Sequence, residues 1–203
     1  ATLTYAAVER KFKNNPIGYE AKYRKAQMAF FQCDFEWAKG QLDVLKASTS
    51  KLIANNAAEL SLVIFENMSE DTLQMALCKF AKAKLAQKQR KRTYAISLLD
   101  SLIEDYKGQP VIDDALMAKA QMLRQRQDYE KAAELYLEVA SRFSYEPFAP
   151  KATYFAAMLF EEQLNDYQKA FELYKIVLTD FPTSVFYHDA RTRLRAIRPN
   201  LVN

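Results

Sequence analysis

An aromatic motif recurs along this sequence at a nearly constant interval, and this repetition constrains the fold more than any other feature. The motif Tyr-x-x-Val-x-x-x-Phe closes at Phe12, Phe143 and Phe181, and Tyr106 takes the same closing position between the first two. From Tyr106 onward the closing residues are separated by 37 and 38 residues. Self-similarity at such a period indicates a chain built from repeated supersecondary units.

Alanine marks fixed positions after each closing aromatic residue. Three columns are visible: Ala21, Ala115, Ala152 and Ala190; then Ala26, Ala120 and Ala157, with Arg195 as the departure; and then Ala38, Ala132 and Ala170. Apolar residues at steps of three and four lie on one face of a helix, and small residues let a second helix approach closely. Only three Gly and six Pro occur, which is few for a β fold. The pattern predicts an all-α chain of paired helices.

A short turn with an aspartate is expected inside each helix pair. Asp34, Asp128 and Asp166 are placed to accept hydrogen bonds from the free backbone N–H groups that begin the second helix. The aromatic residue after each aspartate is expected to pack back between the two helices.

These features together resemble the tetratricopeptide repeat. Residues 150–182 fit it best, with its pattern at Ala157, Tyr167, Ala170, Tyr174 and Pro182. The turn glycine of the family is replaced by Cys33, Gln127 and Asn165. The resemblance covers residues 1–47 and 92–198, and it implies a right-handed α-α superhelix of helical hairpins that binds other proteins.

The spacing is broken once. Counted from Ala38, the next matching alanine is due near residue 75, but Ala95 arrives 57 residues on. One extra helix is therefore expected at 50–69, with apolar residues around much of its circumference: Leu52, Ile53, Leu60, Val63, Ile64 and Phe65. Such a helix is normally buried. Burial inside the solenoid and exposure as a partner surface are the two interpretations.

One solenoid is predicted over residues 1–203. Its parts are the second helix of a truncated repeat (1–15), a repeat (16–48), the inserted helix (50–69), a divergent repeat (70–108), two further repeats (111–145 and 148–182) and a capping helix (183–198). Because the sequence opens on half a hairpin, it is expected to be the C-terminal part of a longer array. The capping helix is expected to turn Tyr187, Ala190, Leu194 and Ile197 inward and its arginines, Arg191, Arg193, Arg195 and Arg198, outward.

Two segments resemble bacterial proteins more closely. "FPTSVFYHDARTRL" (181–194) is similar to the linker and helix of cell-envelope tetratricopeptide-repeat proteins of the outer-membrane assembly lipoprotein and Tol–Pal coordinator type. "CDFEWAKGQLDVLKASTSKLIANN" (33–56) is similar to a segment of long bacterial repeat proteins without an assigned activity. The resemblance implies a periplasmic or outer-membrane-associated location, with the cytoplasm as the alternative. No apolar run in this sequence approaches the ~20 residues of a bilayer span. Membrane association is therefore expected only through a missing N-terminal region.

Catalytic chemistry has little support in the sequence. His188 is the one histidine, no glycine-rich phosphate loop is present, and Cys33 and Cys78 have neither a metal-ligand spacing nor a disulfide-framework pattern. The two cysteines are expected to be small, partly buried side chains. The adjacent carboxylates of Glu161 and Glu162 are expected to point in different directions. No enzyme, cofactor or metal is predicted.

A partner-binding surface is expected on the concave side, where the resemblance places the first helix of each repeat. The candidate lining residues are Tyr23, Gln27, Phe30, Phe31, Phe80, Lys84, Lys88, Met117, Gln121, Arg124, Gln125, Tyr154, Met158 and Glu161. Aromatic, methionine and polar side chains in such a mixture suit an extended peptide or a partner helix. The main functional hypothesis is a protein-interaction scaffold.

A basic segment gives the alternative hypothesis. Residues 1–100 hold 16 Lys/Arg and 10 Asp/Glu, whereas residues 101–203 hold 13 and 15. The positive excess includes the run at 82–92, with Lys82, Lys84, Lys88, Arg90, Lys91 and Arg92. Such a run can recruit an acidic protein or an anionic surface. Nucleic acid is disfavoured because no aromatic residues interleave the run.

Overall fold

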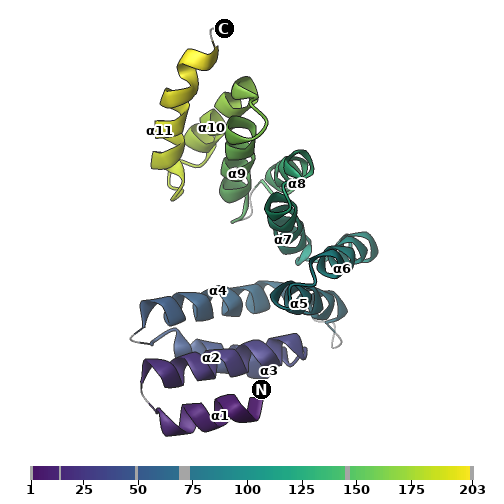
Figure 1. Ribbon diagram of the computed structural model, residues 1–203, viewed down its shortest axis with the longest axis vertical. Helices are drawn as coiled ribbons and strands as arrows, with labels where there is room; N and C mark the ends of the chain where they lie inside the picture. Colours follow the sequence, from purple (N-terminus) through teal and green to yellow (C-terminus); the bar gives the residue numbers. More distant parts are fainter. Residues whose placement is uncertain (1, 14, 49, 69–73, 145–146, 202–203) are drawn as a thin grey trace. The chain divides into compact units, whose positions relative to one another are not determined.

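The computed structural model describes residues 2–13, 15–48, 50–68, 74–144 and 147–201. Within these residues the chain forms eleven α-helices and a terminal 3-10 helix, with no strand (Figure 1). Their bounds are α1 Thr2–Lys11, α2 Pro16–Phe31, α3 Phe35–Leu45, α4 Lys51–Asn67, α5 Met75–Lys88, α6 Arg92–Asp105, α7 Ile112–Gln125, α8 Tyr129–Arg142, α9 Ala149–Glu162, α10 Tyr167–Asp180, α11 Tyr187–Ile197 and η1 Arg198–Leu201. The predicted all-α class is confirmed.

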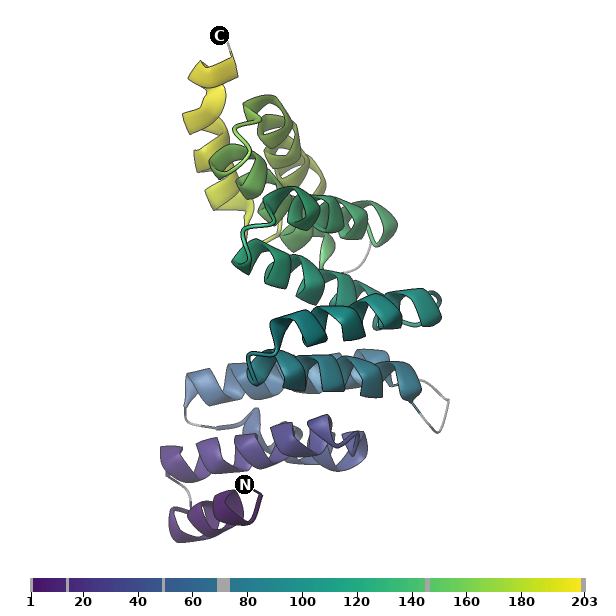
Figure 2. The same cartoon turned by 45° about the vertical axis from the view of Figure 1, so that its right-hand side comes forward.

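The chain divides into two compact units, residues 1–112 (unit 1) and 113–203 (unit 2). In unit 1, α1 packs on α2, α2 on α3, and α3 on α4, while α5 packs on α6 and also touches α2 (Figure 1). In unit 2, α9 packs between α8 and α10, and α10 packs on α11 (Figure 2). Successive helices thus pack in chain order, as in a tetratricopeptide-like solenoid. The right-handed superhelical course stays a prediction.

The alanine columns lie where helices meet. All ten of these alanines are buried: Ala21, Ala26, Ala38, Ala115, Ala120, Ala132, Ala152, Ala157, Ala170 and Ala190. Larger apolar residues such as Leu42, Tyr136 and Tyr174 fill the space beside them and are also fully buried. A methyl group at the crossing point lets two helix backbones come close, and the neighbouring side chains then exclude water from the remaining gap.

The turns inside the hairpins share one backbone feature. Cys33, Arg90, Gln127 and Asn165 all have positive φ angles, of 64°, 61°, 65° and 54°. Three of these are the positions where the family has a turn glycine. A side chain with a Cβ is disfavoured in this left-handed region, which explains why the family prefers glycine at these positions.

The aspartate caps are confirmed in two of three turns. The backbone N–H of Trp37 donates to Asp34 Oδ1 at 3.4 Å, and that of Lys169 donates to Asp166 Oδ1 at 3.0 Å. The prediction for Asp128 is wrong: its side chain makes no cap bond, and its Oδ2 lies 3.8 Å from Nε of Arg126. The arginine competes for the carboxylate from the same turn.

Helix α1 lies close against the start of α2. A Cβ added to Gly18 would overlap the carbonyl group of Phe12, so only glycine permits this approach. Lys25 Nζ of α2 also pairs with Glu9 Oε2 of α1 at 2.8 Å. No residue of α1 is buried, and Leu3 is almost fully exposed.

Helix α4 lies where the extra helix is predicted, and it buries only one side. Ile53, Ala57 and Ile64 are buried, whereas Leu62 and Phe65 are 50% and 67% exposed. Full burial, one of the two interpretations from the sequence, is therefore wrong. The helix needs only one apolar side because α3 is its main neighbour.

A carboxylate of α3 anchors α4 through a hydroxyl group. Ser61 Oγ donates to Asp43 Oδ1 at 2.8 Å, and Lys39 and Lys46 lie 3.1 and 2.7 Å from the Asp43 carboxylate. Hydrogen bonds from Lys46 and Ser61 are the largest causes that hold the pKa of Asp43 well below its usual range. The carboxylate is thus stabilised in its charged form at the α3–α4 contact.

An unexpected disulfide joins Cys33, in the turn after α2, to Cys78 of α5. Both cysteines are half-buried, as expected from the sequence, but the sequence did not predict the bond between them. The two cysteines are 45 residues apart in sequence, and the spacing alone carries no sign of a bond. They meet because α3 and α4 form a detour that brings α5 back beside α2.

Gln127→Gly should stabilise unit 2 by about 0.5–1 kcal/mol, because glycine adopts the left-handed backbone without the strain that a Cβ causes. The higher entropy that glycine gives the unfolded chain offsets only part of this gain. Urea unfolding would measure the free energy. Gln125→Gly, in the last turn of α7, is the matched control and should cost up to about 1 kcal/mol. A Gln127→Gly protein no more stable than the parent would contradict the prediction.

Asp43→Asn should remove an acid-sensitive part of the stability. The folded-state pKa of Asp43 lies below the ordinary aspartate pKa of 3.8, so its contribution is present above about pH 4 and is lost as the pH falls through the folded-state pKa. The difference in Tm between parent and variant should therefore shrink below about pH 4. Glu130→Gln on α8 is the control, and an Asp43→Asn difference that stays constant with pH would contradict the assignment.

Candidate partner-binding faces

The predicted lining residues fall into a buried and an accessible group. Tyr23, Phe30, Phe31, Phe80, Met117 and Tyr154 are buried, whereas Gln27, Lys84, Lys88, Gln121, Arg124, Gln125, Met158 and Glu161 are half-buried or exposed. Phe30 is 2% exposed, and its ring centroid lies 5.7 Å from those of both Phe31 and Phe35. Phe30 and Phe80 therefore hold helices together, and a partner would meet the accessible group.

Two first helices of unit 1 bring part of this group together. Lys88 Nζ of α5 donates to Oε1 of Gln27 on α2, and Arg24 Nη1 donates to the same oxygen at 3.3 Å. The Nε2 of Gln27 in turn lies 3.5 Å from the hydroxyl of Tyr23. We call this surface, formed by Arg24, Gln27, Lys84 and Lys88 above Tyr23, Phe31 and Phe80, the α2–α5 face.

Each cation of the α2–α5 face lies against an aromatic ring. The guanidinium carbon of Arg24 is 5.8 Å from the centroid of Tyr23. The ammonium nitrogens of Lys88 and Lys84 are 5.7 and 5.8 Å from the centroids of Phe31 and Phe80. These distances lie within the range of cation–π attraction. The rings thus form an apolar floor that holds the positive groups at the surface.

Charge on this face is poorly balanced near Lys88. Glu20 Oε1 lies 2.6 Å from Nε of Arg24, whereas Lys88 bonds to a neutral amide. Burial, followed by repulsion from Arg24, lowers the pKa of Lys88, and Glu20 opposes this only in part. The arrangement favours an additional negative charge beside Lys88 and Arg24.

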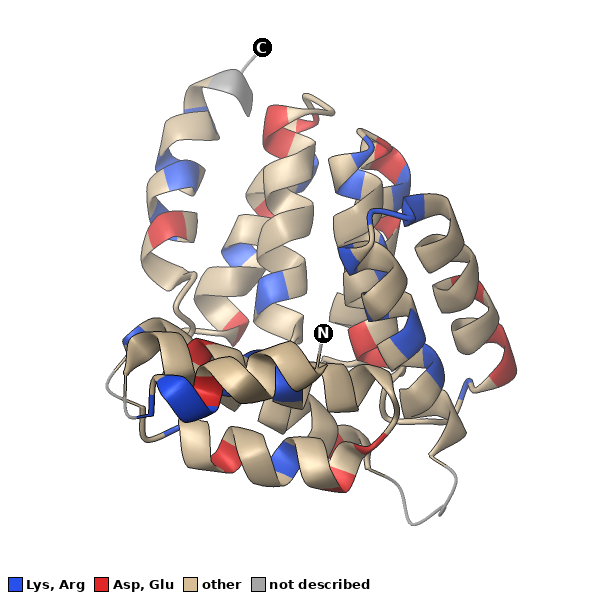
Figure 3. Cartoon of the chain, turned by 60° about the horizontal axis from the view of Figure 1, so that its bottom comes forward, with Lys and Arg blue, Asp and Glu red and all other residues tan. Residues whose placement is uncertain are grey.

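The basic segment 82–92 adjoins this face and shares Lys84 and Lys88 with it. Most helices carry both signs of charge (Figure 3), but the end of α5 and the start of α6 carry Lys and Arg alone. Lys82, Arg90, Lys91 and Arg92 are exposed, and none of them pairs with a carboxylate in the described part of the chain. The predicted basic patch is therefore a solvent-accessible cluster of positive charge.

The first helices of unit 2 present a different surface. Arg124 of α7 lies over the ring of Phe155 on α9, with its guanidinium carbon 5.1 Å from the centroid. The Tyr154 ring stacks on Phe186 at 4.9 Å. Gln121 and Gln125 are exposed and Met158 is half-buried, so these three remain candidate contacts.

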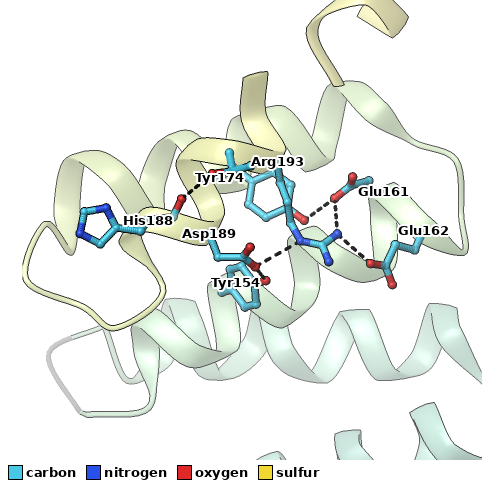
Figure 4. Close-up of polar contacts among 8 residues, drawn as sticks. Tyr154, Glu161, Glu162, Tyr174, His188, Asp189 and Arg193 are labelled. Carbon is cyan, nitrogen blue, oxygen red and sulfur yellow. Dashed lines mark hydrogen bonds and ion pairs between the residues drawn. The ribbon is translucent and has the colours of Figure 1, made fainter. Parts of the chain in front are cut away.

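A polar network closes the end of this surface (Figure 4). Arg193 of α11 reaches α9: its Nη1 lies 3.0 Å from Glu161 Oε2 and 2.7 Å from Glu162 Oε1. Its Nε lies 3.3 Å from Oδ2 of Asp189, which also accepts a hydrogen bond from the Tyr154 hydroxyl. The Tyr174 hydroxyl donates to Glu161 Oε2 at 2.5 Å.

This network overturns two expectations from the sequence. Arg193 is not on the outer side of the capping helix but bonds to α9, unlike the exposed Arg191 and Arg195. Glu161 and Glu162 do not diverge, because the long guanidinium group of Arg193 reaches both carboxylates. One guanidinium nitrogen on a long side chain can contact two carboxylates at neighbouring helix positions.

Electrostatics within the network favour the observed protonation states. Burial, and then the hydrogen bond and charge of Glu161, raise the pKa of Tyr174. Burial disfavours the charged form of Arg193, but the hydrogen bonds to Glu161 and Glu162 outweigh it and raise its pKa. The carboxylates are therefore already engaged within the chain, and we assign the network to holding α11 on α9.

Sequence reasoning missed Arg24, Phe155, Phe186 and Asp189. Arg24 could have been found, since it lies three residues before Gln27 and four after Glu20 on one helix face. Asp189 could have been found through Arg193, four residues further on the same helix. Phe186 could not, because its ring partners Tyr154 and Phe155 are distant in sequence, and neither could the bond of Asp189 to Tyr154, 35 residues away.

His188 and the metal-ligating residue types are the other candidates for chemistry. His188 is exposed, and its ring points away from the network (Figure 4). Among the described residues, no three His, Cys, Asp or Glu side chains form a group that could hold a metal ion. None of the helices described is long and apolar enough to cross a membrane.

Arg193→Gln should destabilise unit 2 by about 1–2 kcal/mol, because it leaves half-buried Glu161 without its cation. Urea unfolding and hydrogen exchange of α11 would measure the loss. Arg191→Gln is the control: this exposed arginine on the same helix should change stability by less than about 0.5 kcal/mol. Equal effects of the two variants would show that the network does not anchor the cap.

Comparison with known families was made for the whole sequence. Residues 80–147 and residues 154–184 each match the family described as "Tetratricopeptide repeat". A comparison with curated proteins gave no match. The resemblance to cell-envelope proteins therefore stays a prediction.

The two matched segments contain the turns at Arg90, Gln127 and Asn165 and five of the buried column alanines. Tetratricopeptide repeats are generally protein-interaction scaffolds and typically have no catalytic activity. The matches support the family that the spacing of aromatic and alanine residues indicates, over residues 80–147 and 154–184.

Proposed function

We propose that this chain is a non-catalytic scaffold that holds an acidic segment of a partner protein on the α2–α5 face. The observation that carries the proposal is the convergence of Arg24 and Lys88 on one neutral amide oxygen of Gln27. Two cations share this acceptor, while the carboxylate of Glu20 already pairs with Arg24.

An incoming carboxylate would improve this arrangement in two ways. It would replace the amide oxygen of Gln27 by an ionised acceptor, and charge-assisted hydrogen bonds are roughly twice as strong as neutral ones. It would also favour charged Lys88, whose pKa is lowered by burial and then by repulsion from Arg24. The rings of Tyr23 and Phe31 beneath the cations add an apolar surface for the partner's aliphatic groups.

The basic segment 82–92 supports the alternative, recruitment of an acidic protein or an anionic surface without the α2–α5 face. Its four exposed cations, Lys82, Arg90, Lys91 and Arg92, have no paired carboxylate among the described residues. Such a cluster attracts negative charge over a distance of about one Debye length, roughly 10 Å at 0.1 M salt. No aromatic rings of the described residues lie beneath these four cations as they do in the α2–α5 face, so binding here should be purely electrostatic. Its affinity should therefore fall steeply as the salt concentration rises.

Location in an oxidising compartment forms part of the proposal. Disulfides persist in secreted and periplasmic proteins and are rare in the cytosol, so the Cys33–Cys78 bond supports the periplasmic or outer-membrane side over the cytoplasm. The resemblance of residues 181–194 to cell-envelope proteins supports the same location.

A labelled oligoglutamate peptide should bind the chain, and fluorescence anisotropy would measure it. Arg24→Gln with Lys88→Gln should weaken binding at least about tenfold, equivalent to about 1.4 kcal/mol, because both charge-assisted bonds are lost. Lys175→Gln on α10 of unit 2 is the control for net charge and should have little effect.

The same assay separates the two hypotheses. If Arg90→Gln, Lys91→Gln and Arg92→Gln together abolish binding while Arg24→Gln with Lys88→Gln does not, the basic segment is the site. Anionic vesicles in place of the peptide test the anionic-surface form of the alternative. An oligoglutamate that no variant affects, or that does not bind at low salt, would contradict both proposals.

A further inference from the structure

The disulfide lies at one end of the α2–α5 face. Cys33 follows the last turn of α2, two residues after Phe31, and Cys78 is in the first turn of α5, two residues before Phe80. Phe31 and Phe80 are both rings beneath the cations of the face. Any movement of one cysteine relative to the other would therefore move the floor of the candidate site.

Few other contacts fix α5 beside α2. The two helices touch over a shorter stretch than α5 shares with its hairpin partner α6. The hydrogen bond from Lys88 to Gln27 joins them near the other end of the face. The remaining connection runs through α3 and α4, which together span residues 35–67. The disulfide closes this detour, with 5.2 Å between the two Cα atoms.

Charge on the face works against this arrangement. Arg24 and Lys88 lie on opposite helices and repel each other; burial first, and then this repulsion, lowers the pKa of Lys88. Without a covalent link, separation of α2 and α5 would relieve this repulsion. It would also raise the conformational entropy of the intervening segment, whose ends would no longer be held together. The disulfide thus opposes the direction in which the charges push the two helices.

We infer that the Cys33–Cys78 disulfide assembles the α2–α5 face, so that the chain captures an acidic segment in its oxidised form and releases it on reduction. Reduction by a dithiol adds two electrons and two protons to the bond, giving two thiols while the dithiol closes its own disulfide. Helix α5 then remains folded against α6 but loses its fixed distance to α2. The binding part of this inference depends on the proposed function; the effect on α5 does not.

Hydrogen–deuterium exchange with and without a dithiol tests the effect on α5 without a ligand. Reduction should increase amide exchange in residues 75–88 and leave unit 2 unchanged, since unit 2 contains no cysteine and serves as an internal reference. Cys33→Ser with Cys78→Ser should show the faster exchange with or without the dithiol. Unchanged exchange in α5 on reduction would overturn the inference.

Anisotropy with the labelled oligoglutamate tests the effect on binding. The oxidised chain should bind, the dithiol should weaken binding at least about tenfold, and the double serine variant should bind weakly and ignore the dithiol. Reduced protein that is folded by circular dichroism and binds as tightly as the oxidised protein would overturn the inference. If the oxidised chain itself does not bind, the proposed function fails, and the exchange measurement alone decides whether the disulfide holds α5.

Discussion

Close approach of helices at buried alanines is the constraint on which the rest of this structure depends. A single methyl group at each crossing lets neighbouring backbones come near enough for Leu42, Tyr136 and Tyr174 to fill the remaining space. The short turn inside each of these hairpins, with its left-handed residue, sets how the second helix returns along the first.

The two units use their charged residues in opposite ways. In unit 2, Arg193 meets three carboxylates, Glu161, Glu162 and Asp189, and the tyrosine hydroxyls complete a network that is satisfied within the chain. In unit 1, Arg24 and Lys88 meet on a neutral amide, and Glu20 pairs with Arg24. Satisfied networks stabilise a fold, whereas an unbalanced charge held at the surface favours a ligand. The contrast is why we place the acidic partner on unit 1.

Insertion of α4 changes how unit 1 is held together. The helix packs mainly on α3, through Ile53, Ala57 and Ile64 and through the bond from Ser61 to Asp43. It lengthens the path between α2 and α5, and the disulfide compensates for that length by joining the two helices directly. The disulfide thus holds together two helices that α3 and α4 separate in the sequence.

The sequence by itself determined the helix pairs, the buried alanine columns, two of the three aspartate caps and the turn positions, because these depend on residues within a few turns of each other. It also located the basic segment, which is a local run of charge. Only the tertiary structure decided that Cys33 bonds to Cys78, that Arg193 turns inward to Glu161, and that α4 leaves one side exposed. These outcomes depend on which distant segments become neighbours, and a side chain's partner across 32 or 45 residues has no periodic signature in the sequence.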